Sequence, residues 1–474
     1  MAYTDLLAVP RPFEGAPCIT VPTSCGFSAG KPVLWRVSVL GQRPLRIRAA
    51  GLPEGLRLNE NIITGSAKRG RYKVTLTADN ALGSDTKTVT LEIGKNKLQR
   101  TPLLGFTTWN AFGSGVTDAD VRSTADALTQ SGIAEYGFSY VNIDSGWQGE
   151  YCGNVIAPNA KFPDMKALCS HVHALGLKCG IYSTPMLTAW GCPQEFASIP
   201  GCTRGRADER FALVNGGIGK EHLEAPNARQ WSDWGFDYVK YDFSPTQPVN
   251  AAPMKKALDA QERDFAFCCT VSCSPDYAHW WSKNTNSWRC NGDTTDDWKN
   301  TSERLYTCDP WAEHVGPSHF YDLDMLALGP MVWNGGKTRF TPEEALFTAT
   351  LHLYFPSPVQ ISTPIDKLGD LEKKLICNEE ILAINQDALC DFPRIVTDCR
   401  TPERHFRLYR RDLDGGRIAY ALFNLSDHYD AVTLPLKGRH ACRDPWQKKD
   451  LGETDRLFIE AEAHCAQVRV LKKI

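Results

Sequence analysis

The sequence predicts an α/β protein in which a (β/α)8 TIM barrel is flanked by an N-terminal immunoglobulin-like β-sandwich and a C-terminal antiparallel β-sandwich. The chain has 474 residues, and a barrel of this type needs about 250 of them. In the middle of the chain, short apolar segments alternate with helical patterns, whereas short alternating β segments occupy both ends. We therefore expect three domains, at residues 1–98, 99–389 and 390–474.

The N-terminal part is predicted to be all β. Its short segments alternate apolar with polar residues and are separated by turns rich in Gly and Asn. The segments cover residues 33–39, 44–50, 72–79 and 86–94. Residues 51–84 resemble the immunoglobulin-like repeat found beside bacterial sugar-processing domains. Such a module could bind sugar or pack on the barrel, and we favour packing.

The barrel is predicted from eight nearly continuous apolar segments, the pattern of parallel strands that are buried on both faces. They cover residues 103–109, 139–144, 177–183, 236–242, 265–273, 286–293, 319–325 and 356–363. Helical patterns cover residues 118–130, 164–175, 221–234, 297–308 and 342–353. Repeated strand and helix units of this kind favour a closed parallel barrel over an open sheet. Short β segments then return after residue 389 and predict the C-terminal sandwich.

Polar residues gather where these strands end, which is the end of a barrel that carries the active site. They are Trp109, Asp144, Tyr182, Lys240, Asp242, Cys273, Ser274, Arg289, Asp293, Asp322 and Asp324. A single such Asp is often only a helix N-cap. Carboxylates recur at four strand ends, however, and barrel packing prefers branched apolar residues. The pattern therefore indicates a catalytic site.

Two of these carboxyl groups fit the cleavage of a glycosidic bond. Retaining enzymes place two carboxyl groups about 5 Å apart around the anomeric carbon, one as nucleophile and one as general acid/base. The nucleophile stays ionised beside a cation, and Lys240 lies two residues before Asp242 on the same strand face. We therefore predict Asp242 as the nucleophile and Asp293 as the acid/base. Aromatic residues near the strand ends (Trp109, Trp147, Tyr182 and Trp288) could pack against a sugar ring.

Other partners are disfavoured by charge and motif content. The net charge is −2, and the sequence lacks the clusters of Lys and Arg that a nucleic-acid-binding surface requires. No apolar run is long enough to span a membrane. The carboxylates lack accompanying histidines, so no metal site is predicted. A phosphate site is equally disfavoured, because the glycine-rich residues 215–219 do not join a strand to a helix.

The expected compartment follows from the N-terminus and the cysteines. No basic segment followed by an apolar one opens the chain, so as written it is expected in the cytoplasm. A signal that had been removed would instead indicate a secreted or periplasmic protein. The 17 cysteines cannot all pair. Reduced thiols are the favoured interpretation, with Cys192 and Cys202 the best candidates for a local disulfide.

Seven segments together resemble glycoside hydrolase family 27, the family of α-galactosidases and α-N-acetylgalactosaminidases. They are GFTTWNAFG, VNIDSGW, GIYS, VKYD, SWRCNGDTTDDW, YDLDML and AINQD, spread over residues 102–390. The resemblance implies Asp242 as nucleophile and Asp293 as acid/base. It also implies a sugar pocket formed by Trp109, Asp144, Tyr182, Lys240, Arg289 and Asp324. It implies no metal or organic cofactor, and an oligosaccharide or glycoside as substrate.

Two departures from the family leave the sugar open. Ser145 stands where the family usually has a second aspartate, and the residues around Cys273 and Ser274 differ from its usual 2-substituent loop. A site that hydrogen-bonds a hydroxyl discriminates strongly through that contact. An α-galactosidase is the leading interpretation. The alternatives are a β-L-arabinopyranosidase, an α-N-acetylgalactosaminidase, an isomaltodextranase-like enzyme or a non-catalytic sugar-binding protein, and a homo-oligomer is possible in each case.

Overall fold

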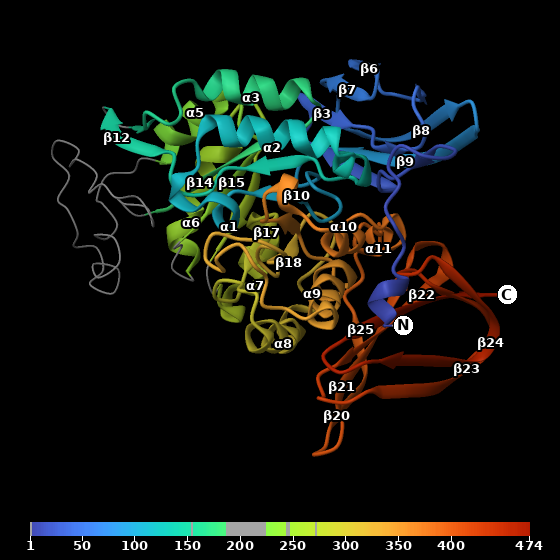
Figure 1. Cartoon of the computed structure of the whole chain (residues 1–474). Helices are drawn as coiled ribbons and strands as arrows, with labels where there is room; N and C mark the ends of the chain where they lie inside the picture. The colour runs from blue at the N-terminus through green and yellow to red at the C-terminus, as the bar shows by residue number, and fades with distance from the viewer. Residues whose placement is uncertain (1, 153–154, 186–223, 243–246, 271–272) are drawn as a thin grey trace.

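The computed structural model describes residues 2–152, 155–185, 224–242, 247–270 and 273–474. Within these ranges, eight parallel strands form one curled sheet at the centre of the molecule (Figure 1). In spatial order they are β18 (Phe320–Asp322), β17 (Ser287–Arg289), β16 (Ala266–Cys269), β15 (Tyr238–Tyr241), β14 (Lys178–Ser183), β11 (Tyr140–Asn142), β10 (Leu104–Thr107) and β19 (Val359–Ile361). A parallel bridge between Leu326 and Ile361 joins the two edges. The predicted barrel is therefore confirmed.

Helices follow the barrel strands along the chain. They are α1 (Trp109–Phe112), α2 (Asp118–Gln130), α3 (Met165–Ala174), α5 (Glu224–Trp234), α6 (Pro248–Asp259), α7 (Ala278–Asn284), α8 (Trp298–Thr307), α9 (Pro342–Tyr354), α10 (Asp370–Ile376) and α11 (Glu379–Asn385). The hairpin of β12 (Gln148–Cys152) and β13 (Val155–Pro158) follows β11. Capping boxes at Thr117 and Thr341 begin α2 and α9, each with an acidic residue three positions later.

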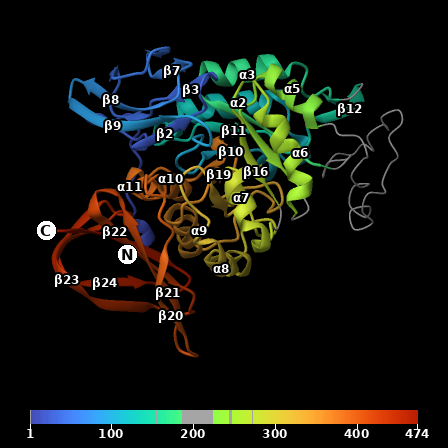
Figure 2. The ribbon, with the colours of Figure 1, turned by 180° about the vertical axis from the view of Figure 1, so that it is seen from behind.

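Residues 18–93 fold as two larger β-sheets around a shared core, seen from behind in Figure 2. One sheet contains β2 (Ser24–Phe27), β9 (Gly83–Ile93), β8 (Gly70–Asn80) and β5 (Arg46–Ala50). The other contains β3 (Val33–Arg36), β7 (Ile62–Gly65) and β6 (Leu56–Asn59), and a short pair joins β1 (Cys18–Ile19) to β4 (Val39–Leu40). Alternating burial along β8 and β9 places Val74, Leu76, Val89 and Leu91 in the core.

This N-terminal module packs against the barrel. Leu103, Tyr140 and Tyr238, at or just before the beginnings of barrel strands, belong to the same hydrophobic cluster as the module's core. Arg36 of β3 also donates to the buried Glu135 of the barrel, with an Nη2 to Oε1 distance of 2.6 Å. The module therefore covers the N-terminal ends of the strands, opposite the end where an active site is expected.

Residues 394–473 form an antiparallel sheet of six strands, drawn in orange and red in Figure 1. In spatial order they are β20 (Arg394–Arg400), β21 (His405–Leu413), β22 (Arg417–Asn424), β25 (Ala466–Lys473), β23 (Asp430–Asp444) and β24 (Lys449–Ala461). Tyr409 of this sheet lies edge-on to Phe355, which follows α9, with the ring centroids 5.3 Å apart, and the tilted ring of Phe423 lies 6.3 Å from Phe355. The sheet is therefore joined to the barrel through an aromatic contact.

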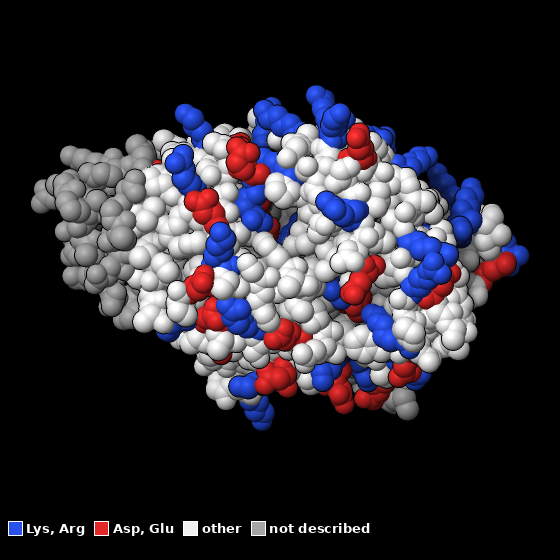
Figure 3. Space-filling model, turned by 90° about the horizontal axis from the view of Figure 1, so that it is seen from above, with Lys and Arg blue, Asp and Glu red and all other residues white. Residues whose placement is uncertain are grey.

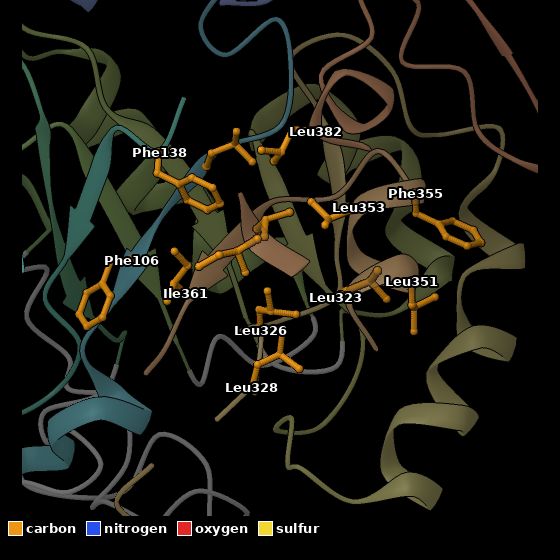
Figure 4. Packing of buried hydrophobic residues seen from close by; sticks show 14 of the residues in the cluster. Phe106, Phe138, Leu323, Leu326, Leu328, Leu351, Leu353, Phe355, Ile361 and Leu382 are labelled. Atoms are coloured by element: carbon orange, nitrogen blue, oxygen red, sulfur yellow. The ribbon is translucent and has the colours of Figure 1, made fainter. Parts of the chain in front are cut away.

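The surface carries charged side chains, and the interior is filled by apolar ones. Side chains of both charges are present on the face drawn in Figure 3. In the described part of the chain, no helix has the length and apolar character needed to cross a membrane. Figure 4 shows the core around the closing strand, where Ile361 lies between Phe106 and Leu326. Their burial positions the strand ends that carry the candidate site.

Candidate active site

The strand register of the barrel sheet places the predicted strand-end residues at the same height along the barrel axis. In the pairing of β14 with β15, Tyr182 lies beside Lys240. In the pairing of β17 with β18, Arg289 lies beside Asp322. Parallel strands end at the same edge, so the residues that follow them meet there. The structure thus gathers the charged candidates at one end of the barrel.

The first charged group is the ion pair of Asp144 and Lys240. The Lys240 Nζ lies 2.7 Å from Asp144 Oδ2, and both side chains are largely buried. The backbone N–H of Ser145 donates to Asp144 Oδ1 at 2.7 Å. Burial raises the pKa of Asp144 above its ordinary value, although Lys240 acts in the opposite direction. Burial also opposes the charge on Lys240, but Asp144 and Asp242 outweigh it and raise the pKa of this lysine.

The second charged group is centred on Arg289, which is only 1% exposed. Its Nη1 lies 2.7 Å from Asp324 Oδ1, and its Nη2 donates to Asp293 Oδ1 at 2.7 Å. Burial disfavours its charge, but the carboxylates of Asp324 and Asp242 outweigh burial and raise its pKa. Arg289 therefore has all three aspartates within electrostatic reach.

The two candidate catalytic carboxyl groups differ sharply in their surroundings. Asp242 directly follows β15 and is 8% exposed, and the Thr270 hydroxyl donates to its Oδ1. The side chain of Asp293 is 71% exposed. A buried carboxylate held by a hydroxyl is preorganised for attack, whereas a carboxyl group in contact with solvent can exchange protons. The two predicted roles call for such a difference, and the roles themselves stay a prediction.

Asp324 is held in an uncommon backbone conformation. Its φ angle is 75°, in the left-handed region that non-glycine residues rarely adopt. The backbone N–H of Thr294 donates to its Oδ2 at 2.8 Å. Although burial acts against its charge, Arg289 and Arg304 hold its pKa well below the ordinary value. Such local strain is typical of residues that a functional site positions.

Of the aromatic candidates, Trp109 and Tyr182 lie at the site and the other two belong to the core. Trp109 begins α1 and is half-buried, while the Tyr182 ring lies 5.7 Å from Lys240 Nζ. Tyr182 is only 1% exposed but lies outside the hydrophobic clusters, whereas Trp147 and Trp288 are completely buried within the main one, so core packing is favoured for these two. Their large apolar rings fill the interior, where burial is most favourable.

Cys273 and Ser274 lie beyond β16 rather than at its end. The Cys273 N–H donates to the Arg289 carbonyl at 2.9 Å, and its thiol is buried. The Ser274 hydroxyl accepts from the Asp276 N–H at 3.2 Å, which caps a short 3-10 helix (Pro275–Tyr277). Their predicted contact with substrate, like the roles of the other candidates, stays a prediction.

Sequence reasoning missed one residue that touches the site and named others that lie outside the described ranges. Thr270, the first residue after β16, was treated only as part of a strand, yet it holds Asp242. The proposed pair Cys192 and Cys202 falls outside the described residues, while the cysteines with described side chains all carry free thiols. Nowhere in the described ranges are three His, Cys, Asp or Glu side chains grouped to hold a metal ion.

Comparison with known proteins gives one consistent family. The family described as Alpha galactosidase A matches residues 110–208 and 207–387, and an Ig domain family matches residues 16–94. An alpha-galactosidase of Cyamopsis tetragonoloba is 30% identical over 395 residues, covering 80% of this chain and 88% of that protein.

Solved structures extend the similarity to the whole chain. A Bacteroides fragilis protein, provisionally described as an alpha-galactosidase, superposes with a TM-score of 0.86 at 28% identity, covering 98% of this chain and 100% of that one. A β-L-arabinopyranosidase of Geobacillus stearothermophilus, solved with arabinose, has a TM-score of 0.70 at 23% identity, covering 79% of this chain and 98% of that one. This second similarity shows a shared fold.

Proposed function

Because the chain belongs to the alpha galactosidase A family of retaining glycoside hydrolases (family 27), we propose that it releases terminal α-galactose from oligosaccharides or glycosides. The observation that carries the proposal is the pairing of buried Asp242 with solvent-exposed Asp293 around one arginine, Arg289. This is the division of labour that double displacement requires, with one fixed nucleophile and one group that exchanges protons.

The proposed reaction has two steps that use the same two carboxyl groups. In the first, Asp242 attacks the anomeric carbon, and the bond to the leaving group breaks as Asp293 gives a proton to the departing oxygen. The product is a sugar joined covalently to Asp242. In the second, Asp293 takes a proton from water, and the water oxygen displaces Asp242 from the anomeric carbon. The configuration is inverted twice and hence retained.

The remaining charged residues are proposed to hold the sugar. The paired groups of Asp144 and Lys240, together with Arg289 and Asp324, offer donors and acceptors to ring hydroxyls. Trp109 and Tyr182 offer apolar faces to the ring. Because these groups are already paired with one another, they are fixed before substrate arrives, and preorganised groups stabilise a transition state most effectively.

A second sugar is favoured by one specific observation, the uncharged Ser145 beside Asp144. Ser145 is almost completely buried and lacks the carboxylate that the family usually places there. That carboxylate would grip hydroxyls around carbons 4 and 6, and L-arabinopyranose has the galactose ring pattern without the hydroxymethyl group. β-L-Arabinopyranosidase activity is therefore the second candidate.

A panel of 4-nitrophenyl glycosides tests the proposal. We expect the α-D-galactoside to have the highest kcat/KM, with the β-L-arabinopyranoside next and the α-D-glucoside and N-acetyl-α-D-galactosaminide far slower. Asp242→Ala measured beside the wild type should abolish turnover without loss of the folded state. A wild type that cleaves the arabinopyranoside best would replace the first candidate with the second. Sugar binding without turnover of any glycoside would refute both.

A further inference from the structure

An exposed tryptophan lies beside the half-buried one at the candidate site. Trp333 follows β18 in the chain and is 51% exposed, although it is among the largest apolar side chains. Its ring centroid lies 5.5 Å from that of Trp109, at an interplanar angle of 52°. Trp109 is in turn the residue that begins α1, two positions after β10 ends. The pair therefore extends an aromatic surface from the strand ends outward to solvent.

Trp333 is fixed in this exposed position by hydrogen bonds. Its indole Nε1 donates to Asn110 Oδ1 at 2.9 Å, and the N–H of the preceding Val332 donates to the Asn110 carbonyl at 2.9 Å. Asn110 itself is buried, and its side chain donates to Ser362 Oγ at 3.0 Å. An exposed aromatic ring that is held in one orientation has little conformational entropy left to lose when a ligand packs on it.

The loop that carries Trp333 is also tied to the segment that carries Asp293. Asn334 Nδ2 donates to Asp296 Oδ2 at 2.9 Å, and Arg339 binds the same carboxylate through its backbone N–H and its Nε, each at 2.8 Å. Asp296 is buried and lies three residues after Asp293. One loop thus spans from the aromatic pair to the segment of the group that protonates the leaving oxygen.

We propose that Trp333 is the platform for the leaving-group sugar, the unit from which the terminal sugar is cut. The pocket residues surround the cleaved sugar, so its neighbour lies on the outward side, where Asp293 is exposed. Sugar rings present faces of C–H groups, and these pack on aromatic rings as other apolar surfaces do. The inference rests on the proposed function, and it makes the substrate a glycoside whose leaving group is itself a sugar.

The test compares two galactosyl donors that differ only in the leaving group. Melibiose carries a glucose in that position, and α-galactosyl fluoride carries no sugar there. For Trp333→Ala, the ratio of kcat/KM on melibiose to kcat/KM on the fluoride should fall about tenfold, the effect expected from the loss of one aromatic contact. The fall should come chiefly from a higher KM for melibiose. Trp333→Phe should retain most of the wild-type ratio because it keeps an aromatic face.

Phe458 supplies the matched control. It is 52% exposed on β24 of the C-terminal sheet, outside the barrel. Phe458→Ala should leave the ratio at the wild-type value. An equal loss on both donors in Trp333→Ala would overturn the proposal, since the ring would then act by positioning Trp109. An unchanged ratio would overturn it as well while leaving the galactosidase function standing, and a wild type inactive on both donors would refute that function itself.

Discussion

Lys240 controls the charge balance on one side of the candidate site. Its ammonium group lies 2.7 Å from Asp144, whose carboxyl group is buried. A buried carboxylate without a cation is costly, and its pKa rises until it takes up a proton. Lys240 limits that rise. In the proposed function, the lysine thereby keeps Asp144 able to accept hydrogen bonds from sugar hydroxyls.

Replacing Lys240 with methionine tests this role. Burial already raises the pKa of Asp144, and removing the opposing cation raises it further. Asp144 should then be protonated at a higher pH, so the acid limb of the kcat/KM profile should move to higher pH. At neutral pH, activity should fall by about a hundredfold or more. Lys255→Met, which removes an ion pair with Asp259 at the surface of α6, serves as the control. A profile that only scales down, with its acid limb unmoved, would contradict the role.

At this scale the sequence predicts which residues carry charge but not how they contact one another. Asp242 and Asp293 could be proposed as catalytic groups because carboxylates at strand ends have no packing reason to be there. The burial of Trp147 and Trp288 could not be predicted, since an aromatic residue near a strand end points either into the core or into the pocket. Thr270 was missed because a hydroxyl after an apolar strand carries no distinctive signal.

Helix α9 packs against β25 of the C-terminal sheet and contains a fully buried histidine. His352 is surrounded by the core, and its Nδ1 lies 3.0 Å from the Thr348 carbonyl, to which it donates. Burial lowers the pKa of His352 to about 4. An unfolded histidine has a pKa of about 6.5. Between these values only the unfolded chain takes up the proton, so stability decreases as the pH falls from about 6.5 to about 4.

The contribution of His352 can be measured from the pH dependence of unfolding. Between pH 6.5 and pH 4, the loss of unfolding free energy caused by His352 amounts to roughly 3 kcal/mol. His352→Gln should therefore lose less stability than the wild type between pH 7 and pH 4.5, whatever its stability at pH 7. Urea midpoints followed by tryptophan fluorescence give the comparison, with the exposed His428→Gln as control. An identical pH dependence in His352→Gln and the wild type would show that another group is responsible.

Elements with strong local signals are predicted most accurately. The expected helix at residues 118–130 has the observed bounds, because Thr117 and Asp120 form a capping box. Strand β16 ends at Cys269, four residues before the end of the expected segment, because apolar character continues after the strand pairing stops. In the C-terminal region the sequence predicts alternating strands, but their order within one six-stranded sheet depends on long-range pairing.

The N-terminal module and the barrel form one packed body through a buried contact. Arg36 and Arg43 of the module both lie within ion-pair distance of Glu135, whose side chain is almost completely buried. The N–H of Val39 donates to the same carboxylate at 3.0 Å. The module thus satisfies a charge that the barrel could not bury alone. Its position at the strand beginnings supports a structural role, which is the interpretation favoured from sequence.

Arg36→Ala should therefore reduce stability without changing catalysis. Loss of one partner leaves the Glu135 carboxylate partly unpaired, which should cost roughly 2 to 3 kcal/mol in unfolding free energy. Arg48→Ala, which removes a more exposed pair with Asp79, should cost less than about 1 kcal/mol. Both variants should keep the wild-type kcat/KM. A loss of activity in Arg36→Ala at full stability would instead indicate that the module communicates with the active site.

The proposed mechanism depends on a covalent bond between the sugar and Asp242, and the most direct measurement is to trap it. A fluorinated galactosyl fluoride that reacts in the first step and is released slowly in the second should leave the sugar attached to the enzyme. Peptide mass spectrometry should then find the sugar on Asp242 and nowhere else. An active enzyme whose label lies on another residue, or which releases product with inverted configuration and no label, would contradict the account.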